Sequence, residues 1–349
     1  MAGVDLPVAP PVRPMLAKAR ATVPADPGVW SYEPKWDGFR AIVFRDGEEL
    51  VLQSRTGKDL GRYFPELMAA FREHLMRRCV LDGEVVVPRE VNGRTRLDWD
   101  SLSQRIHPAL SRVRILSEQT PAHFIGFDAL AVGHQVLMAE PLRVRREVLV
   151  DSIGPGPSCH VTRSTGDPQL ATQWLDTFEG AGLDGVIAKR LGGPYLVGRR
   201  EMVKVKHARD ADCVVIGYRV HKSGRGVGSV LLGLYRADGE LRMVGGAASF
   251  SAADRLRLLD ELAPLRDGDA RDGEATRWHA AADKRWIPVR PERVAEVAYD
   301  QMEGSFGGQR FRHTVRFVRW RPDRDPAGCT FDQLETPVHY DLNDVLEMR

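Results

Sequence analysis

The stretch "SYEPKWDGFR", residues 31–40, places Lys35 beside a turn-forming Asp-Gly pair, with Glu33 before it and Arg40 after it. A lysine amine can form a covalent intermediate as a nucleophile. A free amine, with a pKa of about 10.4, is protonated at neutral pH, so such a nucleophile needs a pocket that favours the uncharged form. A single lysine in this setting is more often a solvated residue at a hairpin bend. The decision between the two interpretations depends on the rest of the chain.

Further charged and aromatic residues follow Lys35 in short motifs, each of which is weak by itself. Asp-Gly pairs are common turn signals, a phenylalanine within an apolar strand is usually core, and alternating lysines usually mark an exposed strand face. The same alternation, however, lets two such lysines reach one ligand. The motifs are "SRTGKD" with Arg55, "LDGE" with Glu84, "IGFDAL" with Phe127, "LDGVIAK" with Asp184, and "VKVK" with Lys204 and Lys206.

The elements that must position these residues are strands mixed with a few helices. An Asp-Gly turn at residues 46–47 predicts a hairpin. Leucine and phenylalanine at helical spacing after Pro65 predict a helix over 65–77. Further strands are expected over 79–88 and 122–132 and from Asp184 and Glu201. Helices are expected near 97–106 and over 141–150 and 168–181.

The texture changes after residue 207, where short strands with glycine-rich turns surround one helix expected at 251–263. This pattern suggests a small closed β-barrel, of the oligonucleotide-binding (OB) type. We therefore predict an α+β chain with one domain over residues 1–206, built of antiparallel sheets and helices, and a barrel domain over residues 207–349.

Composition excludes several classes of protein. The chain has 349 residues and a formal net charge of +2, so its overall charge does not indicate a nucleic acid as partner. Residues 310–324, "RFRHTVRFVRWRPDR", are nevertheless rich in arginine, which fits either a phosphate-binding surface or a solvated edge strand. The four scattered cysteines show no metal-ligand spacing, and no apolar run is long enough to span a membrane. A monomeric protein of the cytoplasm is expected.

Taken together, the ordered motifs resemble those of the nucleotidyltransferases that form a lysyl-nucleotide: ATP-dependent DNA ligases, RNA ligases and mRNA capping enzymes. The first motif of that superfamily is Lys-x-Asp-Gly-x-Arg, which here is "KWDGFR". The later motifs follow in the family's order, and "RWRPDR" resembles the basic motif that ends these enzymes. The stretches "PMLA", "HKSGRGVGSVLLGLY" and "CTFDQL" look most similar to short bacterial ATP-dependent DNA ligases of the C type.

The resemblance implies a nucleotidyltransferase (adenylation) domain followed by an OB-fold domain, and a ligase that seals nicks in duplex DNA during repair. Lys35 would be the nucleophile that takes AMP from ATP. Glu33 would accept from the adenine amine, Phe127 would stack on the base, and Mg²⁺ or Mn²⁺ would be held by Glu84 and Asp184. The residues expected to contact ribose or phosphate are Arg40, Arg55, Glu84, Lys204, Lys206, Arg321 and Arg324.

The sequence departs from the family's pattern in three places. Asp184 stands where glutamate is usual, which puts direct metal coordination there in doubt. Arg324 stands where lysine is usual, and Met202 and Val203 stand where many relatives carry aromatic residues. None of these changes removes a charge sign, so activity is expected to survive.

Nick binding is expected to rest on phosphate contacts, which are salt-dependent and independent of sequence. Residues 310–324 and 221–226 are the candidates. The first motif begins at residue 35, which leaves no room before it for the separate DNA-clasping domain of larger ligases. Weak nick binding is therefore expected. The resemblance implies primase-polymerases and Ku-like end binders as partners, and association with the nucleoid.

Two other interpretations are open at the level of sequence. One is an RNA ligase or capping enzyme of the same superfamily, the latter using GTP. The other is a non-catalytic nucleic-acid-binding module with a vestigial transferase site.

Overall fold

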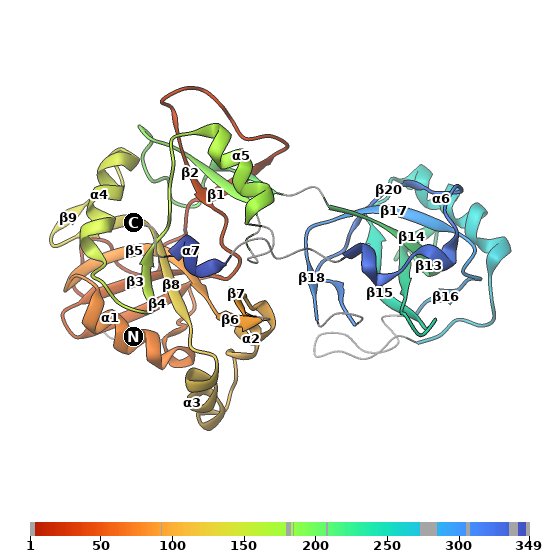
Figure 1. Ribbon diagram of the computed structural model, residues 1–349, viewed down its shortest axis with the longest axis horizontal. Coiled ribbons are helices and arrows are strands. Elements are labelled where there is room, and N and C mark those ends of the chain that lie inside the picture. The colour runs from red at the N-terminus through yellow and green to blue at the C-terminus, as the bar shows by residue number, and fades with distance from the viewer. Residues whose placement is uncertain are drawn as a thin grey trace. The chain divides into compact units, whose positions relative to one another are not determined.

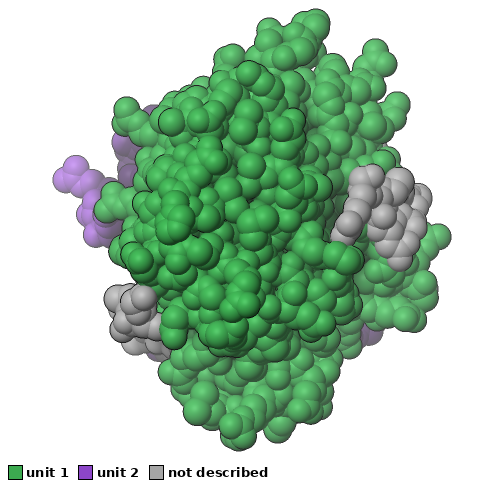
Figure 2. Space-filling view, turned by 90° about the vertical axis from the view of Figure 1, so that its left-hand side faces the viewer, with its two compact units in different colours: residues 1–207, 336–349 green, residues 208–335 purple. Residues whose placement is uncertain are grey.

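Two units make up the chain in the computed structural model, which describes residues 4–91, 93–178, 183, 185–206, 209–272, 285–304, 308–334 and 341–346. The first unit comprises residues 1–207 and 336–349, and the second comprises residues 208–335 (Figure 2). Each unit has a hydrophobic core of its own. The α+β architecture predicted from the sequence is confirmed. Among the described residues, none of the helices is long and apolar enough to cross a membrane.

Two sheets form the centre of the first unit (Figure 1). In sheet A, β1 runs parallel to β12, and the other pairings are antiparallel. Its strands, in spatial order, are β1 (Leu16–Arg20), β12 (Arg200–Val205), β11 (Val186–Arg190) and β2 (Trp30–Pro34). Sheet B has the order β10 (Cys159–Val161), β8 (His123–Val132), β5 (Arg78–Val86), β3 (Phe39–Asp46) and β4 (Glu49–Ser54), with β9 (Gln135–Val136) beside β8.

Sheet B is buried on both faces, which explains the long apolar runs of its strands. On β3, Ala41 and Val43 pack on one side among residues of α1 and α4, while Ile42 and Phe44 pack on the other side. That second side is covered by the N-terminal strap, residues 4–15, whose apolar side chains join the same cluster. The strap is therefore part of the fold, and its apolar side chains cover the face of sheet B that carries Ile42 and Phe44.

Two helices of the first unit, α1 and α5, begin where the local sequence predicts. Pro65 opens α1, and Leu67 and Phe71 are its buried side chains, one turn apart. The carboxylate of Asp167 accepts from the backbone N–H of Gln169 at the start of α5. The helices are α1 (Pro65–His74), α2 (Trp99–Gln104), α3 (Leu110–Gln119), α4 (Leu142–Ser152), α5 (Pro168–Thr177) and α7 (Leu342–Leu346).

The second unit is a strand-rich barrel with one helix, α6 (Ala252–Leu262). An isolated bridge between Ala247 and Val315 links the two ends of its strand order, as barrel closure requires. The order is β15 (Leu241–Ala248), β14 (Val227–Tyr235), β13 (Arg209–Val220), β17 (Val294–Tyr299) and β20 (Arg316–Trp320), with β16 (Ile287–Pro288) beside β13. Two short hairpins complete the strands: β18 (Met302–Glu303) with β19 (Arg310–Phe311) here, and β6 (Pro88–Val91) with β7 (Arg94–Leu97) in the first unit.

The predicted boundary at residue 207 assigns all later residues to the barrel. The C-terminal segment departs from this prediction. Helix α7 belongs to the first unit and packs beside β7 (Figure 1). Leu342 and Val345 are buried there, and the Asp341 carboxylate accepts from the backbone N–H of Thr95 at 3.1 Å. The physical reason is burial of apolar surface in the cluster that also contains Trp36 and Trp174.

Candidate active site

A cavity of about 250 Å³ lies in the first unit, lined by residues of both sheets. Of the residues predicted from the six motifs between residues 31 and 206, it brings together all those that the structure describes. These are Glu33, Lys35, Arg40, Arg55, Glu84, Phe127, Lys204 and Lys206. The remaining walls come from Pro14, Met15, Leu16, Ala17, Pro34, Trp36, Ile187, Lys189, Arg200 and Met202.

Strand register explains why residues distant in sequence meet at this cavity. In sheet A, Ile187 is paired with Glu33 on one side and with Lys204 on the other, so the three side chains share a row. In sheet B, Arg40 on β3 is paired with Glu84 on β5. Each sheet therefore places charged side chains from neighbouring strands side by side, and alternation along each strand puts them on one face.

The loop that carries Lys35 is held close to the sheets by glycines. A Cβ atom on Gly38 would lie 2.1 Å from the carbonyl oxygen of Val85, so only glycine fits there. The backbone N–H of Lys35 donates to the carbonyl oxygen of Gly185 at 2.8 Å, and Gly185 has a φ of +126°. The Trp36 indole donates to the hydroxyl of Thr162 at 2.8 Å. The nucleophile candidate thus stands on a fixed loop rather than at a solvated hairpin bend.

Glu33 is buried beside the cavity, and only one of its two carboxylate oxygens has a partner. Its Oε2 atom lies 2.9 Å from the Nζ atom of Lys189, while Oε1 is buried with no hydrogen-bond partner among the described residues. Burial raises the pKa of the Glu33 carboxyl, and the nearby Lys189 and Arg146 oppose that rise. An unpaired buried acceptor at the wall of a cavity favours a ligand that donates a hydrogen bond.

Phe127 lies at the same wall, 8 % exposed, and two cations lie near its ring. The Arg40 guanidinium carbon is 4.4 Å and the Lys189 ammonium 4.7 Å from the ring centroid. Lys189 also donates to the carbonyl oxygen of Phe127 at 2.7 Å. The ring is therefore fixed by its neighbours before any ligand arrives.

Arg40 has a role that its motif does not reveal. Its Nε and Nη2 atoms donate to the two carboxylate oxygens of Asp82 at 2.7 and 2.6 Å, and the Asp82 side chain is wholly buried. This forked pair uses the donors with which a guanidinium usually grips phosphate. Arg40 therefore shapes the cavity wall through Asp82 and Phe127.

Glu84 is the cavity carboxylate best suited to a change of protonation. Burial raises the pKa of Glu84 to about 7, against the opposing influence of Arg40 and Lys35. Glu84 can therefore pass from the neutral to the charged form near neutral pH. A cation placed in the cavity would favour the charged form.

The donor set fits Mg²⁺ in the manner usual for nucleotide enzymes. No cluster of three or more His, Cys, Asp or Glu suited to a metal occurs in the part of the chain that the structure describes. Magnesium needs no such cage, because it commonly uses one or two carboxylates together with phosphates and water. Glu84 supplies one carboxylate, and the predicted ligand Asp184 lies outside the described residues.

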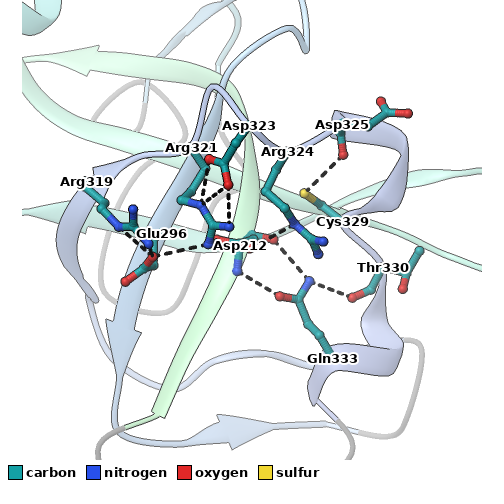
Figure 3. Close-up of polar contacts among 10 residues, drawn as sticks. All are labelled: Asp212, Glu296, Arg319, Arg321, Asp323, Arg324, Asp325, Cys329, Thr330 and Gln333. Atoms are coloured by element: carbon teal, nitrogen blue, oxygen red, sulfur yellow. Dashed lines mark hydrogen bonds and ion pairs between the residues drawn. The ribbon is translucent and has the colours of Figure 1, made fainter.

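The last two predicted residues, Arg321 and Arg324, lie on the barrel in a network of ion pairs (Figure 3). Arg321 is gripped by Asp323 through Nε and Nη2, at 2.9 and 2.8 Å, and by Asp212 through Nη1, at 3.1 Å. Arg324 forms an ion pair with Asp212, and Arg319 forms one with Glu296. Much of the positive charge of this arginine-rich stretch is thus balanced by acids.

Several wall residues were missed from the sequence. Lys189 follows Ile187 by two positions on one strand, so alternation from a cavity residue could have identified it. Residues 14–17, "PMLA", line the cavity where the chain enters β1 beside β12, and the sequence indicates them only through the family resemblance. The exposed Arg200 on β12 gave no local signal.

The model of the ATP dependent DNA ligase domain matches residues 14–206, and that of the ATP dependent DNA ligase C terminal region matches residues 223–324. The chain belongs to the ATP-dependent DNA ligases. This ligase is 70 % identical to DNA ligase C1 of Mycolicibacterium smegmatis over 346 residues, which cover 99 % of each chain. It is 49 % identical to DNA ligase C of Mycobacterium tuberculosis, over 98 % of this chain and 99 % of that one.

A solved structure of a Lig E DNA ligase shares the fold, with a TM-score of 0.55 at 17 % identity. The match covers 88 % of this ligase and 99 % of that chain. The predicted resemblance to short bacterial ligases of the C type is confirmed by the relatives, and ATP is the nucleotide this ligase uses.

Proposed function

We propose that Lys35 carries the adenylate in this ligase and passes it to the 5′-phosphate of a DNA nick. The observation that carries the proposal is the single cavity that gathers Lys35 with an unpaired carboxylate oxygen, an aromatic ring, and two lysines on and directly after β12. In the first step the Lys35 amine attacks the α-phosphorus of ATP. A P–N bond forms, the P–O bond to pyrophosphate breaks, and the amine loses a proton.

Different residues of the cavity contact different parts of ATP. The exocyclic amine of adenine can donate to Oε1 of Glu33, whereas guanine would present a carbonyl oxygen to the same carboxylate. The Lys189 ammonium favours the charged form of that carboxylate, against the effect of burial, and Phe127 offers a face to the base. Lys204 on β12 and Lys206, which follows directly after that strand, offset the charge of the phosphates.

Glu84, together with the nucleotide's phosphates, would hold Mg²⁺, and the ion would neutralise charge at phosphorus. Asp184 is a second candidate ligand. Arg321 and Arg324 are proposed to meet the departing pyrophosphate, which requires them to exchange carboxylate partners for phosphate oxygens. Arg55 is proposed to contact phosphate, since its guanidinium is exposed at the cavity.

The substrate of the later steps is a nick in duplex DNA with 5′-phosphate and 3′-hydroxyl ends. The adenylate moves from Lys35 to the 5′-phosphate, and the 3′-hydroxyl then displaces AMP. Residues 221–226 and the arginines of 310–324 are proposed to contact the phosphate backbone. Repair partners are proposed to be primase-polymerases and Ku-like end binders, with the ligase acting on the nucleoid in the cytoplasm.

Intact mass measured before and after addition of ATP, followed by peptide mapping, tests the proposal. AMP is expected on Lys35 in the unaltered chain and nowhere in Lys35→Ala, and a nicked duplex should discharge it. Labelling with α-labelled GTP instead of ATP, or sealing of nicked RNA but not nicked DNA, would point to the other members of the superfamily. Modification of any other residue would contradict the assignment of Lys35.

A further inference from the structure

Tyr195 lies in the connection between β11 and β12, and its side chain is 3 % exposed. Its hydroxyl has two partners in different parts of the first unit. It donates to Oδ2 of Asp82 on β5 at 2.5 Å and accepts from the backbone N–H of Met15 at 2.9 Å. One hydroxyl therefore joins the centre of sheet B to the N-terminal strap.

The same strap residue is also tied to Arg40. The Nη2 atom of Arg40 donates to the carbonyl oxygen of Met15 at 3.3 Å and to Oδ2 of Asp82 at 2.6 Å. Tyr195, Asp82, Arg40 and Met15 thus form a closed ring of hydrogen bonds. A further bond, from the backbone N–H of Leu196 to the Met15 sulfur at 3.3 Å, fixes the strap at the same point.

Two members of the ring reach the cavity that holds Lys35. Met15 and Arg40 both line it, and the Arg40 guanidinium lies against the Phe127 ring. Tyr195 and Asp82 do not line it. Burial and the neighbouring Asp82 carboxylate raise the pKa of the Tyr195 hydroxyl well above its ordinary value, so it remains a donor throughout the neutral range.

We propose that Tyr195 is a positioning residue for the nucleotide, whose hydroxyl sets the place of the strap and of Arg40 at the wall of the ATP cavity. Without the hydroxyl, the N–H of Met15 loses its acceptor and Asp82 loses one donor, so Met15 and Arg40 can shift. The affinity for ATP then falls, while Lys35 and the groups at the phosphates stay in place. The inference rests on the proposed adenylation at Lys35.

The test is AMP labelling of the full chain as a function of ATP concentration, with Tyr195→Phe beside the unaltered protein. The expected result is a rise of about ten-fold in KM for ATP, the size of one lost hydrogen bond, with the maximal rate changed by less than about two-fold. Asp82→Asn is a second variant and should raise KM in the same way, which covers the case in which Tyr195→Phe folds poorly.

Tyr32→Phe is the matched control, because the buried hydroxyl of Tyr32 donates to the carbonyl oxygen of Pro24 and takes no part in the ring. Its KM should equal that of the unaltered chain. In an Arg40→Lys background, Tyr195→Phe should have little further effect, because both changes break the same ring.

Three results would overturn the role of Tyr195: an unchanged KM, a fall in maximal rate alone, or full additivity with Arg40→Lys. The absence of AMP labelling in the unaltered chain would instead contradict the proposed function itself, and this inference with it.

Discussion

The ammonium group of Lys189 lies 2.9 Å from the carboxylate of Glu33, and both side chains are almost wholly removed from solvent. Removal of one partner of such a pair leaves a buried charge without compensation. Lys189→Met should therefore lower the free energy of unfolding of the first unit by about 3–5 kcal/mol. Chemical denaturation measures this, and Lys58→Met, on an exposed side chain, is the control. A loss as small as that of the control would contradict the importance of the pair.

The unpaired oxygen of Glu33 leads to a prediction about nucleotide choice. Glu33→Gln replaces an acceptor by a group that can also donate to the carbonyl oxygen of guanine. The ratio of AMP to GMP labelling should then fall by about ten-fold or more, because the unfavourable pairing with guanine is relieved. Glu48→Gln, at an exposed site, should leave the ratio unchanged. An unaltered ratio in Glu33→Gln would show that the base is recognised elsewhere.

The protonation of Glu84 should be visible in the pH dependence of adenylation. Burial raises its pKa to about 7, and only the charged form can serve a metal ion. At low Mg²⁺, the labelling rate should fall as the pH drops below about 7, and Glu84→Gln should show a low rate without this step. If the labelling rate of Glu84→Gln fell at the same pH as that of the unaltered protein, the titration would belong to another group.

The same raised pKa makes a prediction about stability with the opposite sign. The folded state binds the Glu84 proton more tightly than the unfolded state, so this group stabilises the fold at low pH. Its contribution is lost as the pH rises from the ordinary glutamate range to about 7, by at most about 1.4 kcal/mol per pH unit. Denaturation of the metal-free protein at several pH values, compared with Glu84→Gln, measures the difference. A smaller pH dependence in the unaltered chain than in Glu84→Gln would contradict it.

The docking of α7 on the first unit can be tested at Leu342, which is fully buried. Leu342→Ala should destabilise the first unit by about 2–5 kcal/mol through lost burial and the cavity left behind. Leu256→Ala, on the exposed face of α6, is the control and should change little. Thermal unfolding followed by tryptophan fluorescence reports the transition. If both variants melt together with the unaltered protein, the helix contributes nothing to the first unit.

Asp212 connects Arg321 and Arg324 on the barrel, and its side chain is 13 % exposed. Asp212→Asn should lower barrel stability by about 1–2 kcal/mol, because two guanidinium groups lose a partly buried charged partner. Asp238→Asn removes an exposed partner of Arg236 and should have a negligible effect. Equal effects of the two changes would mean that the network adds nothing beyond ordinary surface pairs.

Much of this architecture could be predicted from local signals. Pro65 with its apolar spacing indicated α1, the Asp46-Gly47 pair indicated the β3–β4 hairpin, and the order of the motifs indicated which residues would share a cavity. These features depend on neighbours within a few residues, or on a resemblance that covers the chain.

Other features depend on partners that are distant in the sequence, so spacing could not reveal them. Arg40 and Asp82 are 42 positions apart, and Arg321 and Asp212 are 109 apart. Helix α3 has only a weak apolar stripe, with Val113 and Leu116 buried, and was not predicted. Helix α7 has five residues, too few for a periodic pattern.

The return of α7 to the first unit makes the barrel an insertion within another folding unit. During synthesis, residues 341–346 leave the ribosome after the barrel has been made, although they complete the cluster around Trp174. This cluster of the first unit therefore stays incomplete while the barrel emerges and folds. A nascent chain stalled before residue 341 should expose that cluster to proteases, and release of the last residues should protect it.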